Sequence, residues 1–199
     1  MKRGNADFPW LPRPIQKGRR SPLFLILFLI ILAPSIFGQV PQANESQVKA
    51  AFLYNFGKFV KWPNPPTENT FTLCILGQDT SFGTVLESIV AGESIDGKPI
   101  NVRRLGNADE AASCRILYIS SSEQNRLTAI LAALNNHPVL TVSDIPKFAD
   151  RGGMIQFRLE DNRVRFAINL APAASAGIGM SSELLKVAVS VKSGKKVGD

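Results

Sequence analysis

The residues that could carry catalysis are few and widely separated along this 199-residue chain. His137 is the only histidine, and its place between a predicted helix end and Pro138 favours a histidine for structural reasons, because the helix dipole attracts it. Residues 120–122 are all serine but lack the flanking glycines of a nucleophile elbow, so a helix cap explains them better. The carboxylates show no helical pairing near a histidine or a cysteine. The sequence therefore predicts neither an enzyme nor a metal or cofactor site.

Two loops are candidates for a ligand crevice. Residues 77–79 lack the repeated glycines of a phosphate loop, but they follow a predicted strand, and residues 120–122 follow another. Ligands of an open α/β sheet bind beyond the carboxyl ends of its strands, at the topological switch point. Two interpretations stay open, a small-molecule crevice or ordinary connecting loops, for Gly77, Gln78, Asp79, Ser120 and Ser121.

A third candidate is the tripeptide Arg151-Gly152-Gly153, which precedes a predicted strand. Two adjacent glycines at this point favour a tight turn or a bulge, and such a turn would hold Arg151 on its rim. The sequence leaves open whether these residues contact a partner or form a purely structural turn.

The net charge of +7 comes from the two ends of the chain. Residues 1–20 contain six basic residues and one acid and so contribute +5. The last eight residues, 192–199, contribute +2, which leaves the body of the chain neutral. A neutral body cannot release the counterions that drive binding to a phosphate backbone, so binding to DNA or RNA is not expected.

The basic N-terminus precedes an apolar segment and has the pattern of a secretory signal. Residues 23–32 contain no polar side chain, and Ala33-Pro34-Ser35 interrupts the run. We predict a signal peptide over residues 1–38 with cleavage after Gly38, and cleavage after Ala43 is the alternative. The other reading is a retained membrane anchor, but the apolar run is well short of the ~20 residues that span a bilayer.

Export makes a disulfide the favoured reading of the two cysteines, Cys74 and Cys114. Cys74 lies within the first predicted strand and Cys114 just before the third, and these strands can be neighbours in a doubly wound sheet. Neighbouring strands lie about 5 Å apart, which a disulfide can bridge. The competing reading is two buried free thiols.

The remaining pattern predicts one α/β domain over residues 44–191, followed by a basic tail over 192–199. Asn44 and Gln47 form a capping-box signal for an amphipathic helix that Trp62-Pro63 closes. One face of this helix carries a phenylalanine-rich stripe, which forms either core or a partner surface: Val48, Phe52, Phe56, Phe59 and Val60. The lysines are expected mainly on other faces: Lys49, Lys58 and Lys61. Apolar runs and helical spacing then alternate, which predicts a mixed, mostly parallel sheet flanked by helices, with strands at 71–76, 100–105, 115–119 and 138–142.

The C-terminal third changes to strict alternation. Residues 154–159 and 163–170 predict an antiparallel hairpin with Asp161-Asn162 at its turn, because these residues tolerate positive φ. Ser121 or Ser122 is expected to cap the helix before the fourth strand, and a last helix is expected from Ser181 or Ser182 to Val189.

Taken in order, nine segments resemble the YfiR-like family of small periplasmic proteins. They cover nearly the whole mature chain: 48–56, 58–63, 73–77, 97–99, 102–104, 139–144, 151–155, 164–170 and 181–188. The resemblance implies a non-enzymatic, dimeric regulator in the periplasm that binds and represses the periplasmic sensor domain of a membrane-bound diguanylate cyclase. It also implies a redox-responsive disulfide, since Cys74 and Cys114 match one family pair. A second pair found in some members is absent, because residues 149–156 contain no cysteine.

Three hypotheses follow. The first is a periplasmic regulator that controls cyclic di-GMP signalling and biofilm growth by docking on a membrane sensor; the resemblance implies that it is a homodimer. The second is an exported protein that binds a small molecule in the crevice between residues 77–81 and 120–122. The third, an exported enzyme, is the least favoured because the titratable groups that it needs are missing.

Overall fold

The structure is a computed structural model that describes residues 44–64, 69–135 and 137–193. The predicted signal peptide and residues 194–199 of the predicted tail lie outside the described residues. Within those ranges, no helix combines the length and the apolar character that crossing a membrane requires.

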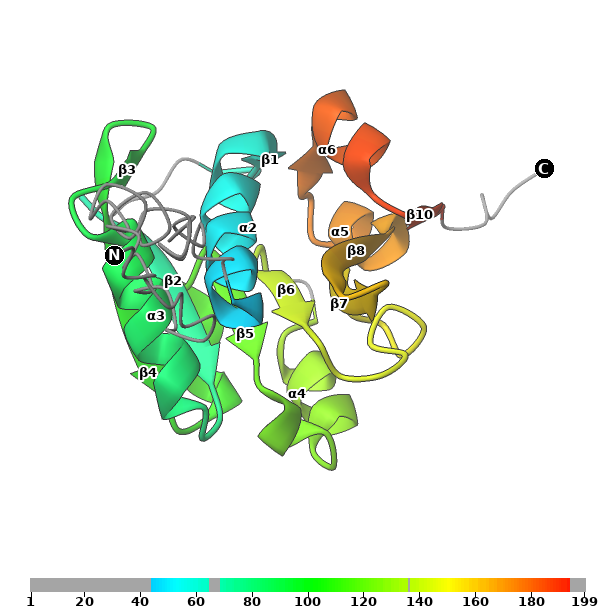
Figure 1. The fold of residues 1–199 in the computed structure, drawn as a ribbon. Coiled ribbons are helices and arrows are strands. Elements are labelled where there is room, and N and C mark those ends of the chain that lie inside the picture. The colour runs from blue at the N-terminus through cyan, green and yellow to red at the C-terminus, as the bar shows by residue number, and fades with distance from the viewer. Residues whose placement is uncertain (1–43, 65–68, 136, 194–199) are drawn as a thin grey trace, which may run out of the picture. The chain divides into compact units, whose positions relative to one another are not determined.

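The described residues form an α/β domain around one large mixed sheet (Figure 1). Its strands follow the order β10-β8-β7-β6-β5-β2-β4-β3 across the sheet. Their bounds are β2 (Phe71–Leu76), β3 (Ser94–Ile95), β4 (Lys98–Leu105), β5 (Ile116–Ile119), β6 (Leu140–Ser143), β7 (Ile155–Glu160), β8 (Arg163–Asn169) and β10 (Ser190–Lys192). Strands β4, β2, β5, β6 and β7 run parallel to one another, and β10 runs parallel to β8. The β7–β8 and β3–β4 pairs are antiparallel. The predicted fold class is confirmed.

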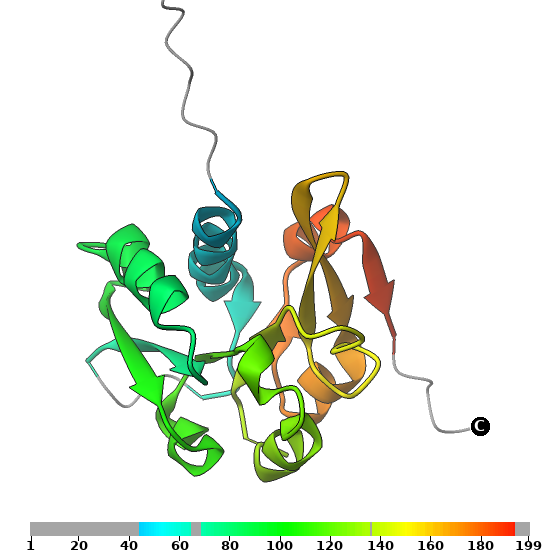
Figure 2. The same ribbon diagram turned by 60° about the horizontal axis from the view of Figure 1, so that its bottom comes forward.

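Helices cover both faces of the sheet (Figure 2). One face carries α2 (Glu45–Phe59), α3 (Thr80–Val90) and α6 (Ser182–Val187), and the other carries α4 (Leu127–Ala133) with the short 3-10 helices η1 (Ala108–Ser113) and η2 (Ser121–Glu123). The segment α5 (Leu170–Ser175) follows β8, and β1 (Val60–Lys61) pairs with β9 (Gly179–Met180) outside the main sheet. The central strands β2, β5 and β6 are buried along their whole length, which explains their nearly continuous apolar sequence.

The first helix begins as the sequence predicts but buries a different face. Asn44 and Gln47 form the capping box, with the Gln47 amide donating to Asn44 Oδ1 at 2.8 Å. The buried positions are Lys49, Ala50, Leu53, Phe56 and Gly57. Phe59 is 40% exposed although it belonged to the predicted stripe, and Lys49 is only 9% exposed although it was expected on another face. The expectation for Lys49 was wrong because its position, four residues before Leu53 and seven before Phe56, lies on the inner side of the helix.

The C-terminal third contains the predicted hairpin and, in the main sheet, one strand that was not predicted. Asp161 and Asn162 have φ values of 48° and 58°, and Phe157 faces Phe166 across the hairpin. After α6, which Ser181 caps, the chain pairs with β8 as the parallel strand β10, so the last helix ends at Val187 rather than Val189. Strand β10 includes Lys192, the first residue of the predicted tail.

The expected serine cap is also displaced. Ser120, not Ser121 or Ser122, is the N-cap, and it caps the short helix η2. Helix α4 begins later, at Leu127, without a side-chain cap among the described residues. The three serines therefore end β5 and start a 3-10 turn, and the amphipathic helix that follows is shorter than the apolar spacing suggested.

Cys74 and Cys114 form the disulfide that the sequence favours, with a Cα–Cα distance of 5.9 Å. Cys74 lies in β2, and Cys114 ends η1 two residues before β5, which is the parallel neighbour of β2. Both residues are buried, at 1% and 3% exposure, in the core cluster on the α4 face of the sheet. The bond therefore joins η1 to the centre of the sheet.

Reduction of this disulfide is expected to destabilise the domain. The two cysteines are separated by 40 residues, and the chain-entropy model gives roughly 4 kcal/mol for a loop of this size, which corresponds to a fall in Tm of about 10 °C. Thermal denaturation with and without a reductant measures the shift. The Cys74→Ala, Cys114→Ala double variant is the control, because its Tm should not respond to the reductant. Two alkylatable thiols in protein purified without reductant would contradict the expectation.

Candidate functional site

A groove opens where β6 ends beside β7. Within the described residues, β6 pairs with β7 only through Val142 with Ile155 and Ser143 with Gln156, whereas β7 continues to Glu160 in its pairing with β8. The chain leaves the sheet at Asp144, and the space beside the outer half of β7 is left without a strand. This space forms a groove of about 630 Å³, which we call the β7 groove; its walls include Glu45, Lys49, Asp144, Lys147, Phe157 and Leu159.

A buried lysine joins two walls of the β7 groove. The Lys49 ammonium lies 2.7 Å from Asp144 Oδ2 and 2.5 Å from Glu45 Oε1. Burial alone would lower the pKa of Lys49, but the hydrogen bonds and charges of the two carboxylates outweigh it and raise the pKa above its usual value. Lys49 therefore carries a charge that ties the start of α2 to the connection between β6 and β7. Two carboxylates share this single cation, so the cluster has a net charge of −1.

Tyr118 on β5 lies beneath the same cluster. Burial raises the pKa of Tyr118 well above its usual value, and the neighbouring Asp144 carboxylate raises it further. The phenol of the folded protein consequently stays protonated at neutral pH. Phe82 of α3 packs on the Tyr118 ring at a centroid distance of 4.4 Å, which fixes its position.

The two raised pKa values predict a loss of stability in base. The unfolded chain releases the Tyr118 and Lys49 protons near pH 10 and 10.5, whereas the folded chain holds them to higher pH. Above these values the folded state binds more protons than the unfolded state, so the free energy of unfolding falls with pH, by up to about 1.4 kcal/mol per pH unit for each group. Urea denaturation at about pH 8 and about pH 11 measures the effect. Tyr118→Phe should reduce the slope, and an unchanged slope would contradict the assignment.

The predicted partner-contact residues Arg151, Gly152 and Gly153 lie in the loop between β6 and β7. Gly152 has a φ of 103°, and a Cβ on Gly153 would lie 2.1 Å from the Phe148 ring. The Gly153 amide donates to the Phe148 carbonyl at 2.9 Å, and Phe148 is fully buried. Arg151 donates through Nη2 to the Gln124 carbonyl at 3.3 Å. The glycines therefore have a demonstrable structural role, and contact with a partner stays a prediction.

Adding a methyl group at Gly153 is expected to destabilise the domain. Gly153→Ala forces its Cβ into the Phe148 ring, and overpacking of this kind costs about 1–3 kcal/mol. Gly106→Ala is the matched control, because a Cβ at Gly106 meets no atom within 4 Å. Chemical denaturation of both variants compares the two sites. Equal stability of the two variants would show that the Phe148 ring moves aside without cost.

The structure brings the two loops of the predicted crevice into contact. The Gln78 amide donates to Ser122 Oγ at 3.1 Å, and a Cβ on Gly77, whose φ is 112°, would lie 2.9 Å from Ser120 Cβ. Asp79 caps α3 by accepting from the Phe82 amide at 3.0 Å. These contacts use the polar groups that a ligand would need and favour a structural role. Of the five predicted crevice residues, Ser121 alone belongs to the walls of the β7 groove.

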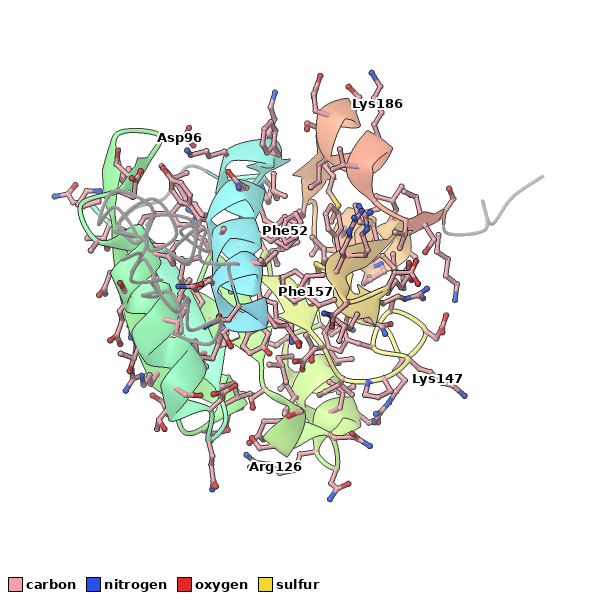
Figure 3. The ribbon with its side chains drawn as sticks, viewed as in Figure 1. Phe52, Asp96, Arg126, Lys147, Phe157 and Lys186 are labelled. Atoms are coloured by element: carbon pink, nitrogen blue, oxygen red, sulfur yellow. A yellow bond between two sulfur atoms is a disulfide. The ribbon has the colours of Figure 1, made fainter. Side chains whose placement is uncertain are left out.

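A second, more apolar groove lies between α2 and α6. It has a volume of about 310 Å³, and we call it the α2–α6 groove; its walls include Phe52, Phe56, Phe59, Phe166, Leu184 and Val187. Phe52 points toward Phe157 of β7, with ring centroids 6.1 Å apart, so its ring also belongs to the aromatic core (Figure 3). Phe59 and Val187 are 40% and 63% exposed at the rim. Part of the predicted phenylalanine stripe is thus core and part is surface.

Sequence reasoning missed both grooves. The β7 groove depends on the difference in length between β6 and β7, which a sequence pattern gives only approximately. The signal for Lys49 was present, since its spacing from Leu53 and Phe56 places it on the buried face of the helix. Val187 was predicted to lie within the last helix, but nothing in the sequence indicated that α6 would pack beside the end of α2.

Together, the fold and these surfaces define a small α/β domain with two grooves and, among the described residues, no cluster of side chains that could hold a metal ion. The model of the YfiR/HmsC-like family matches residues 46–189. The chain belongs to this family, as the resemblance in the sequence implied.

Two solved structures are similar to the chain. One is a conserved domain protein from Vibrio cholerae O1 biovar El Tor strain N16961, with a TM-score of 0.55 and 10% identity over 76% of this chain and 61% of that one. The other is the ABC domain in complex with L-Trp from Streptococcus pneumoniae, with a TM-score of 0.49 and 12% identity over 73% of this chain and 60% of that one. At these identities the first shows the fold alone, and the second carries no argument. The chain spans about three fifths of the length of each structure.

Proposed function

We propose that this protein is a periplasmic, non-enzymatic regulator that binds and represses the sensor domain of a membrane signalling protein, most simply a diguanylate cyclase. Membership of the YfiR/HmsC-like family supports the regulatory role. The buried Cys74–Cys114 disulfide fits an oxidising compartment, since such bonds persist outside the cytosol. Under this proposal, export removes residues 1–38 and leaves the domain free to meet its partner.

The observation that carries the proposal is the apolar rim of the α2–α6 groove. Phe59 and Val187 are large apolar side chains that remain exposed on neighbouring helices, and Leu184 lies at the floor between them. Clustered exposed apolar side chains around a groove are typical of a protein-binding surface. We infer that the partner domain buries this rim.

The regulator is also proposed to act as a homodimer, as the family resemblance implies. Val189 and Val191, at the C-terminal edge of the sheet, are 42% and 38% exposed and follow Val187 along the chain. This edge gives a second copy an apolar surface to cover. Sedimentation equilibrium of the mature protein tests the dimer, and a monomer at all concentrations would remove this part of the proposal.

Charged substitutions at the apolar rim are expected to abolish binding without unfolding the domain. Phe59→Lys and Val187→Lys each bury a charge in the proposed interface, and both positions lie at helix C-termini, where the helix dipole tolerates a cation. Ser88→Lys, near the C-terminus of α3, is the matched control. Co-purification from detergent-solubilised membranes and cellular cyclic di-GMP measure the effect.

Deletion of the gene and the two rim variants should each raise cyclic di-GMP, whereas Ser88→Lys should repress like the wild type. Unchanged cyclic di-GMP after deletion would eliminate a diguanylate cyclase as the partner. Failure of the wild-type protein to co-purify with any membrane sensor would contradict the proposed function itself.

A further inference from the structure

The β7 groove exposes a strand edge that the fold does not use. Strand β7 pairs with β8 along its full length to Glu160, but its pairing with β6 ends at Gln156. The opposite edge of Arg158, Leu159 and Glu160 therefore has no strand partner among the described residues. Unpaired backbone groups on a strand edge are a template for the addition of another strand.

The hydrogen-bond pattern of the hairpin identifies which residue presents this edge. The Asn169 amide donates to the Met154 carbonyl at 2.8 Å, so Met154 directs its backbone groups toward β8. In an antiparallel pair this direction alternates along the strand, and Arg158 and Glu160, an even number of positions away, point the same way. The N–H and C=O of Leu159 consequently point into the groove. The Leu159 side chain is 56% exposed beside them.

The walls of the groove indicate the chemistry of the segment that would bind. Leu159, Phe157 and Pro146 supply apolar surface. Glu45, Lys49 and Asp144 supply a net charge of −1, and the Glu45 side chain is 47% exposed. An extended segment places alternate side chains on one face of a sheet, so an apolar and a basic residue two positions apart would meet these two parts of the wall.

We propose that the β7 groove binds an extended segment of the partner protein, which adds to β7 as a strand in the position that β6 leaves at Asp144. The backbone of the segment pairs with Leu159, an apolar side chain packs on Leu159, and a lysine or arginine faces Glu45. This inference rests on the proposed function, because it takes the bound segment from the protein that is regulated. Main-chain pairing supplies the affinity, and the alternate side chains supply the specificity.

A peptide probe tests the groove without the partner. The probe is a labelled six-residue peptide with valine, lysine and valine at alternate positions and threonine between them. We expect binding to slow hydrogen exchange at the Leu159 amide, measured by NMR. The same peptide with glutamate in place of lysine, and one with N-methylated alternate amides, should bind at least several-fold more weakly. Glu45→Gln should weaken binding of the lysine peptide roughly two- to fivefold.

Leu159→Pro tests the edge in the protein itself. Proline removes the N–H that points into the groove, and because β8 does not use this N–H, the hairpin keeps its pairing. Leu159→Ala removes the side chain but keeps the N–H, so it is the matched control, and thermal denaturation verifies that both variants fold. We expect Leu159→Pro to lower the affinity for the probe and for the partner domain about tenfold or more. Its affinity should also be lower than that of Leu159→Ala.

The outcomes separate this inference from the proposed function. Partner binding that persists in Leu159→Pro, with exchange at Leu159 unaffected by the partner, would overturn the strand addition and leave the regulator standing. Equal binding of the N-methylated and unmodified peptides would overturn it as well. Protection of Leu159 by the peptide in a protein that binds no membrane partner would support the groove and refute the proposed function.

Discussion

A buried charge fixes how the first helix meets the sheet, and the grooves on this face of the domain depend on it. Lys49 is 9% exposed on the inner side of α2, and a cation in that position must be neutralised. Asp144, the residue that directly follows β6, supplies part of the neutralisation from across the groove, and Glu45 supplies the rest from the same helix. The ion pair thereby ties the first turns of α2 to the point where the chain leaves β6. Removing one of the two charged side chains would leave the other charge buried without a partner. This destabilises a folded domain far more than replacing both side chains by apolar ones.

Much of the fold could be predicted because its local signals agree. The capping box at Asn44, the apolar runs of β2, β5 and β6, and the Asp161-Asn162 turn each specify one structure by a separate mechanism. The parallel order then follows from the alternation of strands and helices. The disulfide could be predicted for the same reason, since the order of the strands makes Cys74 and Cys114 neighbours.

The grooves could not be predicted because they depend on small differences between elements. The β7 groove exists because β7 extends four residues beyond Gln156 while β6 stops at Ser143, and strand ends are the least certain part of any sequence pattern. Strand β10 has three exposed residues and lacks the alternation that marks a half-buried strand. Its pairing with β8 is therefore determined by the fold around it, and the position of α6 beside α2 is determined in the same way.

The two grooves border opposite ends of one rigid element. Glu45 and Lys49, at the start of α2, line the β7 groove, and Phe59, at its end, lines the α2–α6 groove. A helix of 15 residues is about 22 Å long. An interface of standard size buries about 800 Å² on each partner and is wide enough to cover such a distance. Since both grooves lie on the α2 face of the sheet, a single partner domain can pack on the apolar rim while one of its extended segments pairs with β7. In the proposed complex the helix would hold the two contacts at a fixed separation, which would make their spacing part of the recognition of the partner.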